Sequence, residues 1–295
     1  MKLTQIRAPD FDLAKTLDSG QVFHWEKIDN GFVGSIGESA VYVEQRGDVL
    51  RASMEGVASA TPGSLELAPP ISELIRNYFA LDHPLAEICG SFPKDETMNA
   101  ARDFCQGLRI IRQPKWECLA TFICSSMKQV AHIRQISRAL RKRFGTAHAI
   151  TGHILYAFPK AGRLAESSEN ELRECALGYR AKNLRATAEL VSRGEADLQS
   201  WVGLTDNELR EKLCRLPGVG AKVANCVMLF AYERVRAFPI DVWIERVLRE
   251  KYRKHNWTSS RLRAFSESYF GVYGGYAQQY LFHYARTGAR SAPIR

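Results

Sequence analysis

A lysine follows directly on a glycine-containing turn in "LPGVGAKVANC", residues 216–226. The surrounding sequence predicts a helix, a tight turn and a second helix that begins near Ala221. Gly218 and Gly220 permit positive φ angles and a close backbone approach at the turn. The free N–H groups at the start of the second helix would then bind an anion such as a phosphate. The residue order of a Walker A loop is absent, so the segment does not indicate nucleotide hydrolysis.

Two roles are open for Lys222, which lies in the first turn of the second predicted helix. The helix dipole disfavours a positive charge there, which suits an amine nucleophile. An exposed lysine that contacts phosphate is the alternative, and this helix alone slightly favours it. Asp241, in "FPIDVWIERVL", is expected to be a helix N-cap. A catalytic Asp241 would have to share a pocket with Lys222, which sequence periodicity does not establish.

The elements that must position these residues divide into two kinds. Residues 21–53 alternate apolar and polar side chains and predict an antiparallel meander, with turns at Asn30-Gly31 and Gly47-Asp48. From Asp95 onward the pattern is almost wholly helical and predicts a compact helical domain. The predicted helices are 96–107, 115–125, 128–143, 169–176, 180–193, 206–214, 221–232, 242–252, 258–270 and 275–286.

Charge is distributed unevenly along the 295 residues. The first 100 residues contain 8 Lys and Arg against 15 Asp and Glu, whereas the remainder contain 33 against 17. A basic C-terminal two-thirds favours a polyanion such as nucleic acid as partner, and a solvated basic surface without a partner is the alternative. Seven cysteines without a Cys-x-x-Cys pair indicate reduced thiols, and neither a disulfide framework nor a metal site. The N-terminus lacks an apolar signal segment and no window suits a membrane span, so an intracellular protein is expected.

Several stretches together resemble one enzyme family. "LPGVGAKVAN" followed by "AFPIDVWIERV" resembles the signature of the base-excision DNA glycosylase superfamily. "DSGQVFHW", "GLRIIRQPKWECLATFICSS", "ALGYRAKNL" and "YAQQYLFHYAR" resemble 8-oxoguanine DNA glycosylases of the eukaryotic type, in the same order and at similar spacing. The resemblance implies an α+β fold, with an N-terminal antiparallel sheet domain (residues 1–95) packed on a two-lobed helical domain (residues 96–295). A helix-hairpin-helix would occupy about residues 206–232.

The resemblance also implies how a damaged base would be recognised. 8-Oxoguanine has a proton on N7 where guanine has a lone pair, so a backbone carbonyl can distinguish the two; the resemblance assigns it to Gly20. Gln278 would pair with the Watson–Crick edge of the flipped base, and Phe282 and Cys226 would lie on its two faces. On a helix, Gln278 and Phe282 share a face. Without the resemblance, Gly20 is the turn before a strand, Phe282 a core residue and Gln278 a surface residue.

In the implied mechanism, Lys222 attacks the sugar C1′ and displaces the oxidised base, and Asp241 stabilises the developing positive charge. The resulting Schiff base permits β-elimination, which cuts the strand on the 3′ side. The remaining implied roles concern DNA and a cation: Tyr179 wedges into the base stack, Arg180 binds the estranged cytosine, Gly218 and Gly220 approach phosphate, and the carbonyls of Cys214, Leu216 and Val219 hold a monovalent cation.

Three positions depart from the family pattern. Where the eukaryotic-type enzymes have asparagines and then an arginine beside the estranged base, this sequence has Met127 and His132. Methionine fills space but offers no useful hydrogen bond to a base edge, so a weaker preference for cytosine is expected. The family's histidine after the catalytic aspartate is replaced by Trp243, which alters the local phosphate and stacking contacts.

The sequence therefore predicts a monomeric, bifunctional 8-oxoguanine DNA glycosylase/AP lyase that acts on double-stranded DNA containing oxidised guanine, in the nucleoid or the nucleus. No cofactor is expected apart from the cation, and no iron–sulfur cluster, because no cysteine follows Cys226. The alternatives are a related glycosylase for another damaged base and a noncatalytic helix-hairpin-helix DNA-binding protein. The first would not need Gly20, Gln278 and Phe282 together, and the second would not need both Lys222 and Asp241.

Overall fold

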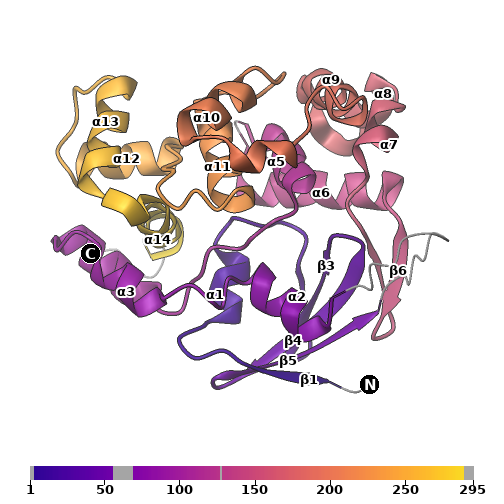
Figure 1. Ribbon diagram of the computed structural model, residues 1–295, viewed down its shortest axis with the longest axis horizontal. Coiled ribbons are helices and arrows are strands. Elements are labelled where there is room, and N and C mark those ends of the chain that lie inside the picture. Colours follow the sequence, from indigo (N-terminus) through magenta and orange to yellow (C-terminus); the bar gives the residue numbers. More distant parts are fainter. Residues whose placement is uncertain (1–2, 56–68, 127, 289–295) are drawn as a thin grey trace, which may run out of the picture.

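The computed structural model describes residues 3–55, 69–126 and 128–288. Its N-terminal part is a five-stranded antiparallel sheet in the order β1-β5-β4-β3-β2, seen at the bottom of Figure 1. The strands are β1 (Thr4–Arg7), β2 (Glu26–Ile28), β3 (Gly31–Ile36), β4 (Ser39–Arg46) and β5 (Val49–Glu55). The predicted meander is confirmed, and β1, which pairs with β5, is an addition to it.

The described chain also contains fourteen α-helices, most of which cover the upper part of Figure 1. The predicted helices agree with the observed ones within a few residues at each end. The helices are α1 (Leu13–Asp18), α2 (Ile71–Tyr78), α3 (Leu85–Gly90), α4 (Glu96–Phe104), α5 (Lys115–Cys124), α6 (Val130–Phe144), α7 (Ala161–Ala165), α8 (Glu169–Leu172), α9 (Arg180–Ser192), α10 (Asp206–Cys214), α11 (Ala221–Ala231), α12 (Val242–Glu250), α13 (Ser259–Tyr269) and α14 (Gly274–Thr287).

One prediction for the helical part is wrong. Within the region expected to be almost wholly helical, β6 (Ala147–Ile150) and β7 (His153–Tyr156) form a hairpin. Its turn is left-handed at both central residues, with φ +49° at Thr151 and +77° at Gly152, as a two-residue hairpin requires. The hairpin reaches down to the N-terminal sheet, where Ile150 is fully buried with Val33 and Ala40.

Two main cores lie on either side of the junction between the sheet and the helices. The smaller core packs α1 and α2 on the sheet, and the larger core unites the helices from α3 onward. Since α3 precedes residue 96 yet packs in the larger core, the division of the chain at residues 95 and 96 remains a proposal. The fold itself is confirmed as α+β, a sheet domain packed on a helical domain.

A buried ionic network joins the two cores. Arg141 of α6 forms an ion pair with Glu117 of α5 and donates to Ser35 Oγ of β3 at 2.7 Å. His24 Nδ1 lies 3.4 Å from Glu117, and its Nε2 lies 2.8 Å from the carbonyl of Ser35. Burial lowers the pKa of His24 well below its usual range, and the charge of Arg141 acts in the same direction, so the imidazole is neutral. The network therefore fixes the sheet against the helices through polar groups that would be costly to leave unpaired.

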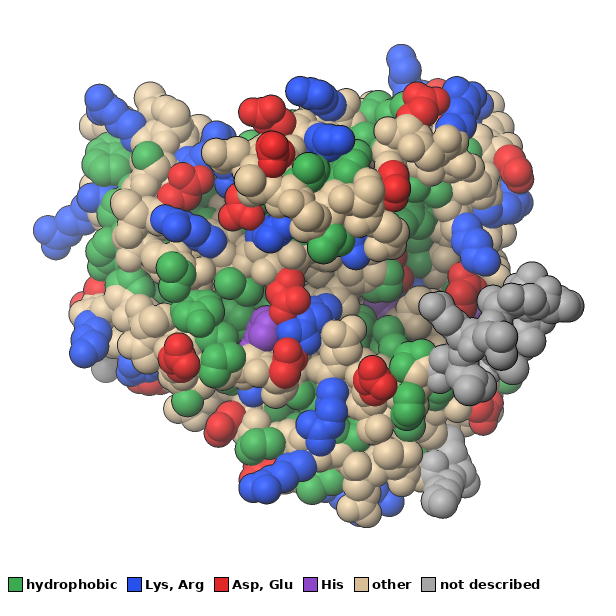
Figure 2. All heavy atoms as spheres, in the orientation of Figure 1, with side chains coloured by type: hydrophobic (Ala, Val, Ile, Leu, Met, Phe, Trp, Pro, Cys, Tyr) green, Lys and Arg blue, Asp and Glu red, His purple; other side chains and the backbone are tan. Residues whose placement is uncertain are grey.

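Basic and acidic side chains are intermixed on the molecular face shown in Figure 2. That face therefore presents no continuous basic surface. No helix in the described ranges is long and apolar enough to cross a bilayer.

Candidate active site

Lys222 lies at the start of α11, where the sequence predicted it. Its Nζ donates a hydrogen bond of 3.0 Å to the hydroxyl of Ser125 and lies 5.3 Å from the centre of the Phe122 ring. Ser125 in turn donates to the carbonyl of Phe122 at 2.8 Å. The amine is half-buried and held against the end of α5, and this contact with Ser125 was not predicted from the sequence.

The hairpin before Lys222 has the geometry that its glycines suggested. α10 begins at Asp206 behind a capping box of Thr205 and Glu208, and ends eight residues later at Cys214. Gly218 has φ +81°, and a Cβ on it would lie 2.8 Å from the Cβ of Asn183, so another residue there would be strained and crowded. Gly220 is exposed, and no side chain caps the start of α11. The first N–H groups of α11 are thus left to an outside acceptor.

Asp241 is the N-cap of α12, as predicted. Its Oδ1 accepts hydrogen bonds from the backbone N–H groups of Trp243 (3.1 Å) and Ile244 (2.9 Å). Burial raises the pKa of Asp241, while the bond from Ile244 and the positive charge of Lys222 oppose the rise. The cap and Lys222 therefore share one electrostatic environment. Trp243 contributes its backbone to this cap, and its ring lies 5.5 Å from the guanidinium of Arg246.

Cys226, one helical turn after Lys222, lies in the same environment. Burial raises the pKa of its thiol to about 11; the charge of Lys222 lowers it and that of Asp241 raises it. The thiol is therefore protonated near neutral pH. It offers a small, nearly apolar surface 3% exposed to solvent.

Gly20 lies against Phe282 of α14. It has φ +84°, and a Cβ on it would lie 2.9 Å from Phe282 Cε1 and 3.7 Å from Val130 Cγ2. Only a residue without a side chain fits this approach. Gln278, one turn before Phe282, is 4% exposed, and its buried Oε1 accepts no hydrogen bond from the described residues. An unpaired buried amide oxygen is costly, so it is available to a donor on a ligand.

Tyr179 and Arg180 lie at the start of α9. The Tyr179 ring is 62% exposed, and the Arg180 guanidinium lies 4.3 Å from its centre. Arg180 is only 5% exposed and donates to the carbonyls of Ser126 and Leu177. In this arrangement the guanidinium is engaged by the neighbouring loop, and its reading of cytosine stays a prediction. His132 is exposed on the first turn of α6, and Met127 lies outside the described residues.

The structure thus brings the predicted residues together in two groups. Lys222, Asp241 and Cys226 form one, and Gly20 and Phe282 meet in the other, on the helix that also holds Gln278. A direct contact between Cys226 and Phe282 is not established, so their sandwiching of a base remains a prediction. Sequence reasoning missed the partners of these groups: Ser125, Ser126 and Gln279. "FICSS" and "YAQQY" contain them, but nothing local indicates what they contact.

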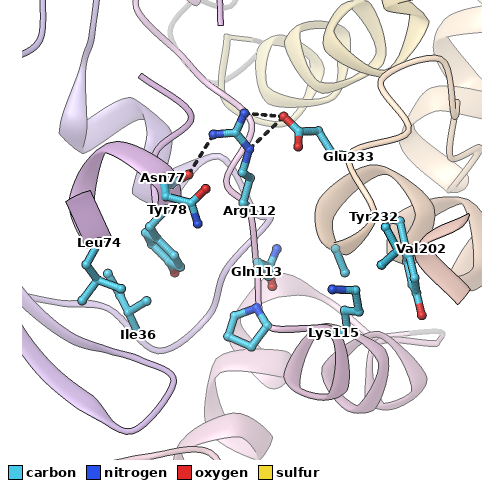
Figure 3. Close-up of a pocket in the computed structure, with 12 residues that line it drawn as sticks. Ile36, Leu74, Asn77, Tyr78, Arg112, Gln113, Lys115, Val202, Tyr232 and Glu233 are labelled. Carbon is cyan, nitrogen blue, oxygen red and sulfur yellow. Dashed lines mark hydrogen bonds and ion pairs between the residues drawn. The ribbon is translucent and has the colours of Figure 1, made fainter. Parts of the chain in front are cut away.

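The best-defined cavity, of about 360 Å³, does not belong to this site. It borders the far end of α11, and the helix rises about 14 Å over the nine residues from Lys222 to Ala231. Figure 3 shows Arg112 paired with Glu233, with Lys115 and Tyr232 on the same side of the cavity as Glu233 and with Leu74 and Tyr78 on the other side. Arg112 is also paired with Asp82 at 2.6 Å. Asp82 and Glu233 both neutralise the charge of Arg112. These ion pairs therefore link the two cores beside the cavity.

No group of three or more His, Cys, Asp or Glu residues in the described part of the chain is arranged to hold a metal ion. The predicted monovalent cation would instead be held by backbone carbonyls, those of Cys214, Leu216 and Val219. One of them, the carbonyl of Leu216, accepts a hydrogen bond from Val219 N–H at 3.1 Å, which keeps the turn tight. A carbonyl has a second lone pair, so this bond is compatible with a cation.

Two related proteins and a solved structure align with nearly the whole chain. It is 31% identical over 297 residues to an N-glycosylase/DNA lyase of Arabidopsis thaliana, covering 96% of this chain and 78% of the relative. It is 28% identical over 306 residues to a probable N-glycosylase/DNA lyase of Methanothermobacter thermautotrophicus, covering 96% of each. A solved structure, the 8-oxoguanine glycosylase/lyase of Clostridium acetobutylicum with double-stranded DNA containing cytosine opposite 8-oxoguanine, shares 31% identity at a TM-score of 0.84, over 95% of this chain and 93% of that one.

Family comparisons agree with the helix-hairpin-helix and with the N-terminal sheet. Residues 120–270 match the HhH-GPD superfamily of base excision DNA repair proteins, so the chain is a helix-hairpin-helix enzyme of base excision repair. Residues 4–119 match the N-terminal domain of 8-oxoguanine DNA glycosylase. The chain belongs to the 8-oxoguanine DNA glycosylase family and is an N-glycosylase/DNA lyase, which confirms the resemblance seen in the sequence.

Proposed function

We propose that this enzyme excises 8-oxoguanine from duplex DNA with Lys222 as nucleophile, and then cuts the strand by β-elimination. The observation that carries the proposal is the shared electrostatic environment of Lys222 and Asp241. Lys222 lies in the first turn of α11, whose N-terminus has no side-chain cap. A lysine that only contacted phosphate would not need a half-buried carboxylate beside it. The support from relatives is that an 8-oxoguanine glycosylase/lyase of the same fold shares 31% of its residues.

The chemistry would proceed in two stages. The neutral amine of Lys222 attacks C1′; the N–C1′ bond forms, the C1′–N9 bond breaks, and the base leaves with the electron pair and is protonated. The Asp241 carboxylate stabilises the positive charge that develops on the sugar. The attached nitrogen then loses one proton, and the C1′–O4′ bond breaks as O4′ takes up a proton, which gives a protonated Schiff base. A base removes a C2′ proton, the C3′–O3′ bond breaks, and the 3′ phosphate leaves with its electron pair, so the strand is cut.

Base selection would depend on Gly20 and on the helix α14. The Gly20 carbonyl accepts the N7 proton that guanine lacks, and Gly20 can stand this close to the ring plane because it has no side chain. Gln278 would satisfy its unpaired Oε1 by a donor on the Watson–Crick edge. Phe282 and Cys226 would cover the two faces of the base.

Duplex binding would use the hairpin and the start of α9. Gly218, Gly220 and the N–H groups of α11 bind a phosphate, and a monovalent cation on the carbonyls of Cys214, Leu216 and Val219 would add positive charge there. Tyr179, which projects from α9, fills the stack beside the flipped nucleotide. With Met127 in place of asparagine, which could hydrogen-bond a base edge, and His132 in place of arginine, the preference for cytosine opposite the lesion is relaxed. The active form is a monomer.

Borohydride trapping tests the nucleophile. Duplex oligonucleotides with 8-oxoguanine, an alkylated base or no lesion are incubated with the enzyme and borohydride, and adducts are separated on a denaturing gel. We expect an adduct with 8-oxoguanine alone, and none with Lys222→Gln. An adduct that survives Lys222→Gln would show that another amine attacks. Trapping on a different lesion would favour another glycosylase, and no adduct at all would favour a noncatalytic DNA-binding protein.

A further inference from the structure

The turn that contains Gly20 is anchored by side chains on both of its flanks. On one flank, Gln279 of α14 donates a hydrogen bond of 2.9 Å from Nε2 to the carbonyl of Ser19. Gln279 is 2% exposed and joins positions 260 residues apart in the sequence. Arg286, further along the same helix, donates to the carbonyl of Asp18. The helix that carries Gln278 and Phe282 therefore also holds the residues just before Gly20.

On the other flank, Gln21 is completely buried and uses both ends of its amide. Its Nε2 donates to the carbonyl of Arg109 at 2.8 Å and to Ser19 Oγ at 2.9 Å, and its Oε1 accepts from the N–H of Ile111 at 2.7 Å. The Gln21 carbonyl accepts from Gln113 Nε2 at 2.8 Å. Residues 109–113 thus fix the side chain of Gln21 and the peptide between Gln21 and Val22.

Between these anchors, the Gly20 carbonyl accepts no hydrogen bond from the described residues. Glycine at φ +84° has wide conformational freedom, and its peptide can rotate unless its neighbours are held. A hydrogen bond is sensitive to such rotation, because it weakens steeply as the angle departs from linearity. The direction of the Gly20 carbonyl is therefore set by the fixed carbonyls of Ser19 and Gln21.

We propose that Gln279 is a positioning residue for lesion recognition: it holds the carbonyl of Ser19 so that the Gly20 carbonyl points at the N7 proton of the flipped base. Gln113 has the same role on the other flank. The inference rests on the proposed function, in which Gly20 recognises 8-oxoguanine. The helix α14 both anchors the turn at Gly20 and carries Gln278 and Phe282. It therefore fixes the position of the Gly20 carbonyl relative to the Gln278 contact with the base edge and the Phe282 contact with the base face.

Two reactions of the enzyme separate positioning from general damage to the site. Excision of 8-oxoguanine needs the Gly20 carbonyl, whereas cleavage of a preformed abasic site needs Lys222 but no base contact. Gln279→Met keeps the length of the side chain and removes its donor. We expect single-turnover excision of 8-oxoguanine to fall roughly 10-fold, the effect of about one hydrogen bond, and abasic-site cleavage to stay within about 2-fold.

Gln45→Met is the matched control. Like Gln279, Gln45 donates from Nε2 to a backbone carbonyl, that of Phe11, at 2.6 Å. Its Oε1 accepts from Leu13 N–H at 2.7 Å, and it secures the start of α1. We expect this variant to keep both rates. Thermal unfolding of each variant shows whether it is folded; if Gln279→Met is not, Gln113→Met must give the same split between the two reactions.

Unchanged excision by folded Gln279→Met, or an equal loss of both reactions, would overturn the positioning role. A wild-type enzyme that cleaves abasic sites without excising 8-oxoguanine would instead overturn the proposed function. The two failures are distinguished by whether the wild type or only the variant departs from expectation.

Discussion

The side-chain amine of Lys222 donates a hydrogen bond of 3.0 Å to the hydroxyl of Ser125. Ser126, the next residue, accepts a hydrogen bond from Arg180 through its backbone carbonyl. The proposed nucleophile and the proposed reader of the estranged base are therefore attached to consecutive residues at the end of α5. A shift of Ser125 and Ser126 would therefore move both Lys222 and Arg180.

Removal of the Ser125 hydroxyl tests whether it orients the nucleophile. We expect Ser125→Ala to slow excision and abasic-site cleavage together by about 10-fold, because both reactions use Lys222 and one orienting hydrogen bond is lost. The borohydride adduct should still form, more slowly. Ser126→Ala is the control, since it leaves the carbonyl that binds Arg180 in place; equal effects of the two substitutions would argue against orientation by Ser125.

Asp241→Asn separates charge from helix capping. Asparagine caps as well as aspartate, so stability at neutral pH should be kept, whereas Asp241→Ala should cost about 1 kcal/mol. Excision should fall by about 100-fold or more in both variants, because the carboxylate charge is lost. Single-turnover rates and denaturant unfolding of the two proteins measure these effects; a fully active Asp241→Asn would remove the charge from the mechanism.

The raised pKa of Asp241 also predicts in which direction stability changes with pH. Since burial raises the folded-state pKa above its ordinary value of 3.8, the folded chain keeps this proton to higher pH than the unfolded chain does. The contribution of Asp241 to stability is therefore present below that ordinary value and is lost as pH rises through the folded pKa. The excision rate should rise over the same interval as the carboxylate forms, and Asp241→Asn should lack this acid limb.

Glu117→Ala should destabilise the fold strongly. It would leave the guanidinium of Arg141 buried without its counter-charge, at a cost of about 3–5 kcal/mol in the free energy of unfolding. The control is Glu174→Ala, which breaks an exposed pair between the same helix α6 and Glu174, at Arg143; it should cost less than about 1 kcal/mol. Urea titrations measure both. Similar losses of unfolding free energy in the two variants would mean that burial does not make the Glu117–Arg141 pair more important than the exposed pair.

Glu233 should give the fold a dependence on acidic pH. A hydrogen bond from His83, with further bonds and charge from Arg112, lowers the pKa of Glu233 to about 2. A lowered folded-state pKa stabilises above the ordinary value of 4.5 and loses that effect as pH falls towards 2. Because the carboxylate is 41% exposed, solvent screening limits the effect to about 1 kcal/mol. Wild type and Glu233→Gln should thus converge in stability between pH 5 and pH 2; a constant difference would contradict this.

Opposite-base preference should respond to Met127 and His132. The wild type should excise 8-oxoguanine opposite adenine at a rate closer to that opposite cytosine than does the double variant Met127→Asn/His132→Arg. That variant restores the asparagine and arginine of the family pattern. The measurement is the ratio of single-turnover rates for the two duplexes. His153→Arg, the same change on the exposed β6–β7 hairpin, controls for added charge. An unchanged ratio in the double variant would contradict the prediction.

Local signals predicted the helix-hairpin-helix well. The capping box at Thr205 and the glycine turn set α10 and the start of α11 from their own residues, so 206–214 was predicted and observed without error. The places of Lys222 and Asp241 at two helix starts were also predicted locally, whereas their catalytic roles were assigned by resemblance and stay predictions. The β6–β7 hairpin was missed because strands of four residues are stabilised mainly by what they pack on, here the sheet far back in the sequence.

The supporting contacts could not be predicted for a related reason. Ser125 meets Lys222 across 97 residues and Gln279 meets Ser19 across 260, and neither pairing leaves a periodic pattern. Arg180 was assigned to a base edge by resemblance, while the structure shows it bonded to Ser126. Single-sequence reasoning identifies which residue types could do the chemistry, whereas the partners that hold them depend on the tertiary fold.

The β6–β7 hairpin has a consequence for the order in which the protein is made. All five strands of the N-terminal sheet leave the ribosome within the first 55 residues, but Ile150, which is buried with Val33 and Ala40, follows almost 100 residues later. Glu117, which contacts His24, and Arg141, which donates to Ser35, also come late. The part of the nascent sheet around Val33 and Ala40 therefore stays uncovered until the β6–β7 hairpin is made, and its completion is a late event of synthesis.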